Sequence, residues 1–262
     1  GAETTSMSRV QHRSTISRRP APSASKASSA SVDLGAVSPF SALPRAAIAD
    51  LSDLAERRVW RTRSTVLLNR EFTDRIGVVS AGRLRLVAIS ADAGLICLNE
   101  LTEGDVLGLC TSLLGLSPGD NLRLCIDRPA EIVSVPKEHF MRSMRAHAEF
   151  NDAVVRSLTQ TVVDLHTRLF EVAALDVRAR LAGRLLALAS GKSRLIEGAP
   201  THAMLAAAIG ASREAVSRQL SDLEKERFIR CRRRTIEIID WSGLDALYRR
   251  AAGGRLFRES SK

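Results

Sequence analysis

The most constraining feature of this chain is the run THAMLAAAIGASREAVSRQLSDLEKERFIRCRRR at residues 201–234. Leu205 and Ile209 lie four residues apart, the spacing of one helix face. Gly210 then supplies a residue that tolerates a left-handed backbone, and Ser212 offers a side-chain oxygen that can cap a second helix. The run therefore predicts two helices joined by a tight turn, the helix-turn-helix arrangement.

The second helix, expected over residues 213–226, divides into an apolar and a polar face. Val216, Leu220 and Leu223 recur at i, i+4 and i+7 and form one apolar stripe. In a helix-turn-helix the first two turns of this helix enter the major groove, where Arg can pair with guanine and Glu can accept from cytosine. Four polar residues of these turns lie largely off the stripe and are the predicted base-reading set: Arg213, Glu214, Ser217 and Arg218. An ordinary solvated surface helix is the alternative interpretation of the same pattern.

A block of arginines follows this helix and leads into the alternating segment TIEII at residues 235–239. A winged helix, in which a basic β-hairpin follows the second helix, accounts for both the block and the alternation. In that arrangement the predicted phosphate contacts are Arg232, Arg233 and Arg234. The wing also makes the surface-helix alternative less satisfactory, because an isolated surface helix gives no reason for a basic hairpin beside it.

The run IGASREAVSRQLSDLEKERFI resembles the recognition-helix signature of the Crp/Fnr family of bacterial transcription regulators. The resemblance implies that the polar set of the second helix reads bases, and that His202 and Ser212 touch phosphates. Ala215 departs from the family pattern, where Thr is usual. Half-sites of the TGTGA kind and of the TTGAT kind both stay open, because Arg213 fits the former and Ser217 fits the latter.

The charge of the chain is concentrated in its C-terminal part. The formal net charge is +10, and residues 176–262 carry 18 basic and 10 acidic side chains, whereas residues 39–175 carry 16 and 17. A basic surplus around the predicted helix-turn-helix suits phosphate binding. With 262 residues, 45% of them hydrophobic, the chain predicts more than one folded unit.

Residues 1–38 are rich in Ser, Ala, Arg and Pro and predict a disordered basic tail. The tail either adds weak nonspecific affinity for DNA or is an inert extension. Residues 39–149 instead show short Val-, Leu- and Ile-rich segments separated by turn residues, which predicts a compact barrel or roll of β-strands. This region is similar to the cyclic-nucleotide-binding β-roll of the Crp/Fnr family, and its segment EGDVLGL matches the family's Gly-Asp-x-x-Gly element. The fold expected overall is α+β.

The resemblance also locates an effector pocket, but three of its elements depart from the cAMP-binding pattern. Leu109 stands where cAMP-binding members have Glu, and Asp120 and Asn121 align with the Arg-Ser pair that holds the cyclic phosphate. Leu165 and His166 stand in place of the Thr-Ser pair that meets the adenine. The candidate pocket is therefore Leu109, Asp120, Asn121, Arg123, Leu165 and His166, and cAMP is not the expected ligand there. A cyclic-nucleotide-responsive regulator with an atypical pocket remains an alternative.

A long helix with a regular apolar seam is expected over about residues 150–172, which together with a hinge makes up residues 150–175. Spacings of three and four alternate along the seam, as at the a and d positions of a two-stranded coil. The seam residues are Val155, Leu158, Val162, Leu165, Leu169 and Val172. The seam predicts a homodimer, which matches a palindromic operator. Asp176 then predicts an N-cap, and with it a hinge leading into a DNA-binding unit at residues 176–262.

Cys231 lies between Arg230 and Arg232, so the thiol, if exposed, is expected to have a lowered pKa and to be a candidate redox switch near DNA; an incidental small residue is the alternative. The cysteine and histidine spacings indicate no metal site, no cofactor and no disulfide framework, which favours a cytoplasmic location. An enzyme with a cupin-like roll is the competing class, but residues 57–136 contain no His to bind a catalytic metal. A nonspecific nucleoid-binding protein is a further alternative. The expected partners are double-stranded DNA, a second copy of the chain and RNA polymerase, with no membrane.

Overall fold

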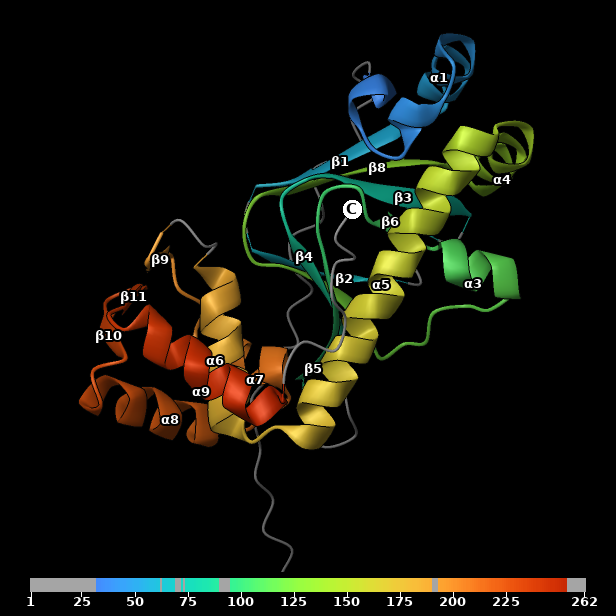
Figure 1. Ribbon diagram of the computed structural model, residues 1–262. Helices are drawn as coiled ribbons and strands as arrows, with labels where there is room; N and C mark the ends of the chain where they lie inside the picture. Colours follow the sequence, from blue (N-terminus) through green and yellow to red (C-terminus); the bar gives the residue numbers. More distant parts are fainter. Residues whose placement is uncertain are drawn as a thin grey trace, which may run out of the picture.

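The computed structural model describes residues 32–61, 63–68, 72, 74–89, 95–189 and 193–253 (Figure 1). A sheet-built N-terminal part, one long helix and a C-terminal winged helix follow one another along the chain. The predicted mixed fold is therefore confirmed. Among the described residues, no helix is both long enough and apolar enough to cross a membrane.

The predicted tail falls mostly on residues 1–31, which lie outside the described residues, but residues 32–38 are folded. Leu34 begins the 3-10 helix η1 (Leu34–Ala36) and is fully buried, and Val32 and Val37 are also buried. The carboxylate of Asp33 accepts a hydrogen bond of 3.0 Å from the N–H of Gly35. Extending the disordered tail to residue 38 was thus wrong, because these apolar side chains contribute to the core despite their Ser- and Ala-rich surroundings.

Two four-stranded antiparallel sheets form the β-roll, residues 56–136. The first has the order β1-β8-β3-β6, with bounds Glu56–Trp60, Ala130–Pro136, Arg75–Ala81 and Val106–Leu107. The second has the order β2-β7-β4-β5, with bounds Ser64–Leu67, Leu122–Ile126, Leu84–Ile89 and Leu95–Leu101. Alternate side chains of both sheets fill one apolar core, including Trp60, Val79, Leu124 and Ile132. Gly82 makes the turn between β3 and β4 at φ +87°, where a Cβ would lie 2.5 Å from the carbonyl oxygen of Pro129.

Helices cover the first sheet and lead away from it. They comprise η2 (Phe40–Ala42), α1 (Arg45–Ser52), α3 (Leu109–Leu114), α4 (Lys137–Ala146) and the 27-residue α5 (Ala148–Ala174). The rings of Phe40, Phe140 and Phe150 pack together with centroids 5.1 to 5.9 Å apart. This aromatic cluster fixes the first turn of α5 to the roll, from which the helix runs on to the C-terminal part (Figure 1).

The winged-helix region, residues 176–253, has its own core. Its elements are α6 (Val177–Leu188), β9 (Leu195–Glu197), α7 (His202–Ile209), α8 (Arg213–Lys225), β10 (Ile229–Arg232), β11 (Thr235–Ile238) and α9 (Trp241–Ala252), with strand order β10-β11-β9. Asp176 caps α6, its carboxylate accepting a 2.7 Å bond from the N–H of Ala179, so the predicted N-cap is confirmed. On α6, a Cβ at Gly183 would lie 2.6 Å from the ring of Tyr248, so a side chain there would push α9 away.

The winged-helix region packs against the second sheet of the β-roll, with α7 next to β5. Arg128 of the roll donates to the carbonyl oxygens of Glu197 and Gly198 at 2.8 and 2.9 Å. Arg184 of α6 forms an ion pair with Glu100 of β5. These polar contacts position the helix-turn-helix relative to the roll.

Candidate nucleic-acid interface

The turn between α7 and α8 is held by the residues that the sequence singles out. Gly210 has φ +62°, the left-handed conformation in which glycine carries no Cβ penalty. Ser212 precedes α8 in an extended conformation, and its Oγ accepts a 3.1 Å bond from the N–H of Ala215. Thr201 caps α7 in the same way, accepting from the N–H of Met204 at 3.3 Å. At the start of each helix, one free backbone N–H group is thus bonded by the side chain of the N-cap residue.

The orientation of α8 is set by its apolar stripe. Val216, Leu220 and Leu223 are at most 3% exposed and lie in the core of the winged-helix region. Near the end of the helix, Arg178 of α6 pairs with the carboxylate of Glu226 through two bonds of 2.8 and 2.6 Å. Packing on one side and this bidentate pair at the end leave the opposite face of α8 outward.

The predicted base-reading residues lie on that outward face. Arg213, Glu214 and Arg218 are exposed, and Ser217 is partly buried. The Oγ of Ser217 lies 2.7 Å from Nδ1 of His202, an exposed residue at the start of α7. When the hydroxyl donates to Nδ1, Nε2 carries the ring proton and is a donor suited to an anion. Sequence spacing gives no signal for this contact between the two helices.

The wing is the hairpin of β10 and β11. Arg230 is directly opposite Glu237, and the two side chains form an ion pair of 3.1 Å. Arg232, Arg233 and Arg234 are exposed at and beside the turn, where Arg234 has φ +62°. The N–H of Ala199 donates to the carbonyl oxygen of Arg234 at 2.8 Å, which ties the turn to the chain before α7. Three of the four arginines of the basic block are thus exposed at the tip of the hairpin.

Cys231 differs from its prediction. Burial raises the pKa of its thiol, and the carboxylate of Glu224 raises that pKa further. The expected lowering by Arg230 and Arg232 is wrong, because successive side chains of β10 point to opposite faces of the strand. Cys231 is half-buried on the α8 side, where its N–H also donates to Glu224 at 2.7 Å. This environment disfavours the thiolate and makes Cys231 a poor redox switch.

The six residues of the predicted effector pocket come from α3, the loop before β7, β7 itself and α5. Leu109 is buried at the start of α3, and Asp120 and Asn121 are exposed before β7. Arg123 donates to the carbonyl oxygens of Asp120 and, at 2.9 Å, Leu122.

Leu165 and His166 are exposed on α5. Leu165 lines a cavity of ≈ 310 Å³ between α5, β5 and α6, which the other five residues do not line. Groups of three or more His, Cys, Asp or Glu side chains that could hold a metal do not occur in the part of the chain that the structure describes.

Comparison with known proteins agrees with this geometry. Residues 179–247 match the model of the Crp-like helix-turn-helix domain. The global nitrogen regulator of Synechococcus elongatus is 22% identical over 182 residues, which cover 67% of this chain and 82% of that protein.

Two solved structures share the fold. A transcriptional regulator of the Crp/Fnr family from Eubacterium rectale has a TM-score of 0.66 and 19% identity, and the match covers 82% of this chain and 99% of that one. The c-di-GMP responsive global regulator CLP from Xanthomonas campestris has a TM-score of 0.63 and 20% identity, covering 75% and 100%. Residues 179–247 therefore form a Crp-like helix-turn-helix domain, and the chain shares its fold with transcription regulators of the Crp/Fnr family.

Proposed function

We propose that this chain is a transcription regulator of the Crp/Fnr type that acts as a homodimer and reads a palindromic operator with two copies of α8. The observation that carries the proposal is the apolar face of α5. Leu158 packs against the core of its own chain, but the other seam residues are 41% to 67% exposed: Val155, Val162, Leu165, Leu169 and Val172. A row of exposed large aliphatic side chains along one helix face is stabilised by a second copy of the same helix.

A two-fold axis along α5 also suits DNA recognition. Two winged-helix regions related by such an axis meet half-sites about 34 to 36 Å apart, one turn of the duplex. In our assignment Arg213, Glu214 and Arg218 read base edges, with Ser217 as a further contact. His202, Ser212 and the wing arginines Arg232, Arg233 and Arg234 hold phosphates. The exposure of the three long side chains on α8 supports the first part of this assignment.

We further propose that the regulator does not use cAMP in the usual pocket of the roll. The exposed carboxylate of Asp120 would repel a cyclic phosphate. The guanidinium of Arg123 is already bonded to backbone carbonyls of its own loop. A cytoplasmic location, RNA polymerase as a further partner, and divisions of the chain near residues 149 and 175 belong to the same proposal.

Selection of bound sequences from a pool of random duplexes, with and without cAMP or cGMP, tests the function. A palindromic motif that appears without nucleotide supports the proposal. A motif that appears only with cAMP or cGMP would show that the pocket of the roll does bind a cyclic nucleotide. Binding without any motif, with a steep dependence on salt, would identify a nonspecific nucleoid-binding protein instead.

A further inference from the structure

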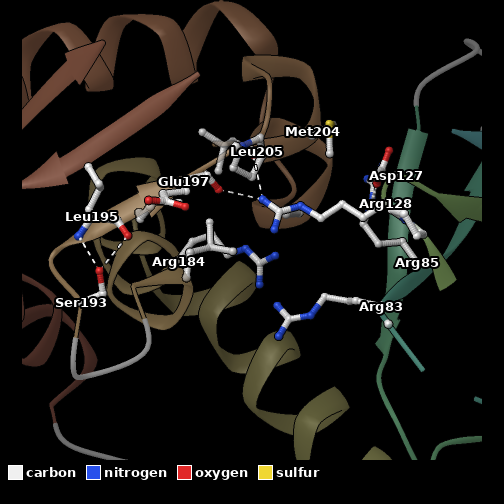
Figure 2. Close-up of a pocket in the computed structure, with 17 residues that line it drawn as sticks. Arg83, Arg85, Asp127, Arg128, Arg184, Ser193, Leu195, Glu197, Met204 and Leu205 are labelled. Carbon is white, nitrogen blue, oxygen red and sulfur yellow. Dashed lines mark hydrogen bonds and ion pairs between the residues drawn. The ribbon is translucent and has the colours of Figure 1, made fainter. Parts of the chain in front are cut away.

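A cavity of ≈ 650 Å³ lies between the β-roll and the winged-helix region, and arginines dominate its polar lining. Arg83 and Arg128 come from loops at the edge of the second sheet, and Arg184 comes from α6. Figure 2 shows the guanidinium groups of these three side chains pointing into the same space. The cavity thus brings together three positively charged side chains that are far apart in the sequence.

The charges around this space are only partly balanced. A fourth arginine, Arg85, is neutralised by Asp127 at 2.6 Å. Arg83 and Arg184 share the single carboxylate of Glu100, which lies 3.7 Å from Arg83. Arg128, by contrast, donates to two backbone carbonyl oxygens and forms no ion pair with a carboxylate among the described residues.

Among the described residues of the wall, Glu197 contributes the one carboxylate besides Asp127, and Glu100 lies outside the lining. Three converging guanidinium groups therefore have two carboxylates around them, those of Glu100 and Glu197. In addition, Nε of Arg184 is buried and has no hydrogen-bond partner among the described residues. Guanidinium groups held close together repel one another, and an anion bound between them offsets that repulsion.

The rest of the wall is apolar. Leu188, Leu195, Met204 and Leu205 line it from the winged-helix side. The volume falls within the range of about 300 to 1,000 Å³ that is typical of small-molecule sites, which is more than a bare phosphate needs. A ligand that fits both the arginines and the apolar wall carries a negative group and an organic part.

We propose that this cavity binds a phosphorylated organic anion, with its phosphate among Arg83, Arg128 and Arg184 and its organic part against Leu195 and Leu205. Such a ligand touches the β-roll and the winged-helix region at once. Its binding therefore fixes the helix-turn-helix relative to the roll. That this regulates DNA binding rests on the proposed function.

Calorimetric titration of the full chain with ATP and with pyrophosphate tests the site, at fixed ionic strength and without divalent cations or DNA. We expect ATP to bind more tightly than pyrophosphate because only ATP has an organic part for the apolar wall. Arg83→Ala and Arg128→Ala should each weaken ATP binding at least about tenfold, the effect of losing one charge-assisted hydrogen bond. Arg83→Lys keeps the charge without the planar guanidinium and should bind ATP with intermediate affinity. This variant still tests the site if an alanine variant fails to fold.

Two control variants separate this site from general charge effects. Arg142→Ala removes an exposed arginine of α4, and Arg218→Ala removes one from the outward face of α8; both should bind ATP like the wild type. Glu100→Gln should bind ATP more tightly, because it removes a carboxylate that competes for Arg83 and Arg184.

Absence of ATP binding, equal losses in Arg142→Ala and Arg83→Ala, or weaker binding in Glu100→Gln would overturn the proposal. Equal affinity for ATP and pyrophosphate would contradict the proposed contact of the organic part with Leu195 and Leu205. Because DNA is absent, the result does not depend on whether the chain selects a palindromic operator.

Discussion

The imidazole Nδ1 of His202 and the hydroxyl Oγ of Ser217 lie 2.7 Å apart and connect the first turn of α7 to the second turn of α8. This bond brings a predicted phosphate ligand and a predicted base-reading residue into one unit. A change at either residue therefore alters the position of the other.

The His202–Ser217 pair predicts coupled effects on DNA affinity. His202→Ala and Ser217→Ala should each weaken operator binding by about 0.5 to 1.5 kcal/mol, the net contribution of an ordinary hydrogen bond. The double variant should lose less than the sum of the two. Titrations of all four proteins on one operator measure this, and strictly additive losses would mean that the bond has no part in the complex.

Arg218 and Arg233 should act differently on DNA. Arg218→Ala should lose about 1 to 3 kcal/mol on the operator and less on random duplex, so specificity relaxes. Arg233→Ala should weaken both duplexes alike and lower the slope of log affinity against log salt by about 1. Affinities measured on both duplexes over a range of salt compare them, and indistinguishable variants would refute the separation of base reading from phosphate binding.

A charge placed in the apolar seam of α5 should disrupt the dimer. Leu169 is 67% exposed in the single chain, and Leu169→Lys would bury an unpaired ammonium between two helices. Gln160→Lys puts the same charge on an exposed α5 position off the seam. Sedimentation velocity should show a monomer for the first variant and a dimer for the second. Dimers in both cases would place the interface elsewhere.

Cys231 should react slowly with alkylating reagents. Its raised pKa leaves little thiolate at neutral pH, and the reactive fraction grows as the pH rises toward and above 9, the ordinary thiol pKa. Exposed Cys110 should be modified first at pH 7. Mass spectrometry of timed samples with iodoacetamide gives both rates, and faster modification of Cys231 than of Cys110 would contradict its half-buried environment beside Glu224.

Local patterns predicted the winged helix well because its signals lie close together in the chain. The turn at Gly210 and the cap at Ser212 depend on residues within a few positions of each other, and the stripe through Val216 shows which face of α8 is outward. All three are found as expected.

Features that depend on distant segments were missed or misjudged. The pKa of Cys231 is raised first by burial and then by Glu224 of α8, and strand spacing reveals neither. Leu34 looks like part of a polar tail until the fold brings the core of the roll against it. The arginine-lined cavity combines Arg83, Arg128 and Arg184, whose separations in the chain carry no periodic signal.

The aromatic cluster of Phe40, Phe140 and Phe150 anchors one end of α5. A small change of angle there gives a larger displacement at the other end of the helix. The 27 residues of the helix span about 40 Å at 1.5 Å per residue. At the far end, Arg168 bonds to the carbonyl oxygens of α7, and Glu171 accepts from the hydroxyl of Tyr248 at 2.7 Å. Arg168 and Glu171 lie about 27 and 32 Å along the helix from Phe150, so a tilt of about 5° at Phe150 would move these contacts sideways by about 2.5 Å. Repacking of the three rings at one end of α5 would thus shift its contacts with α7 and α9 at the other end.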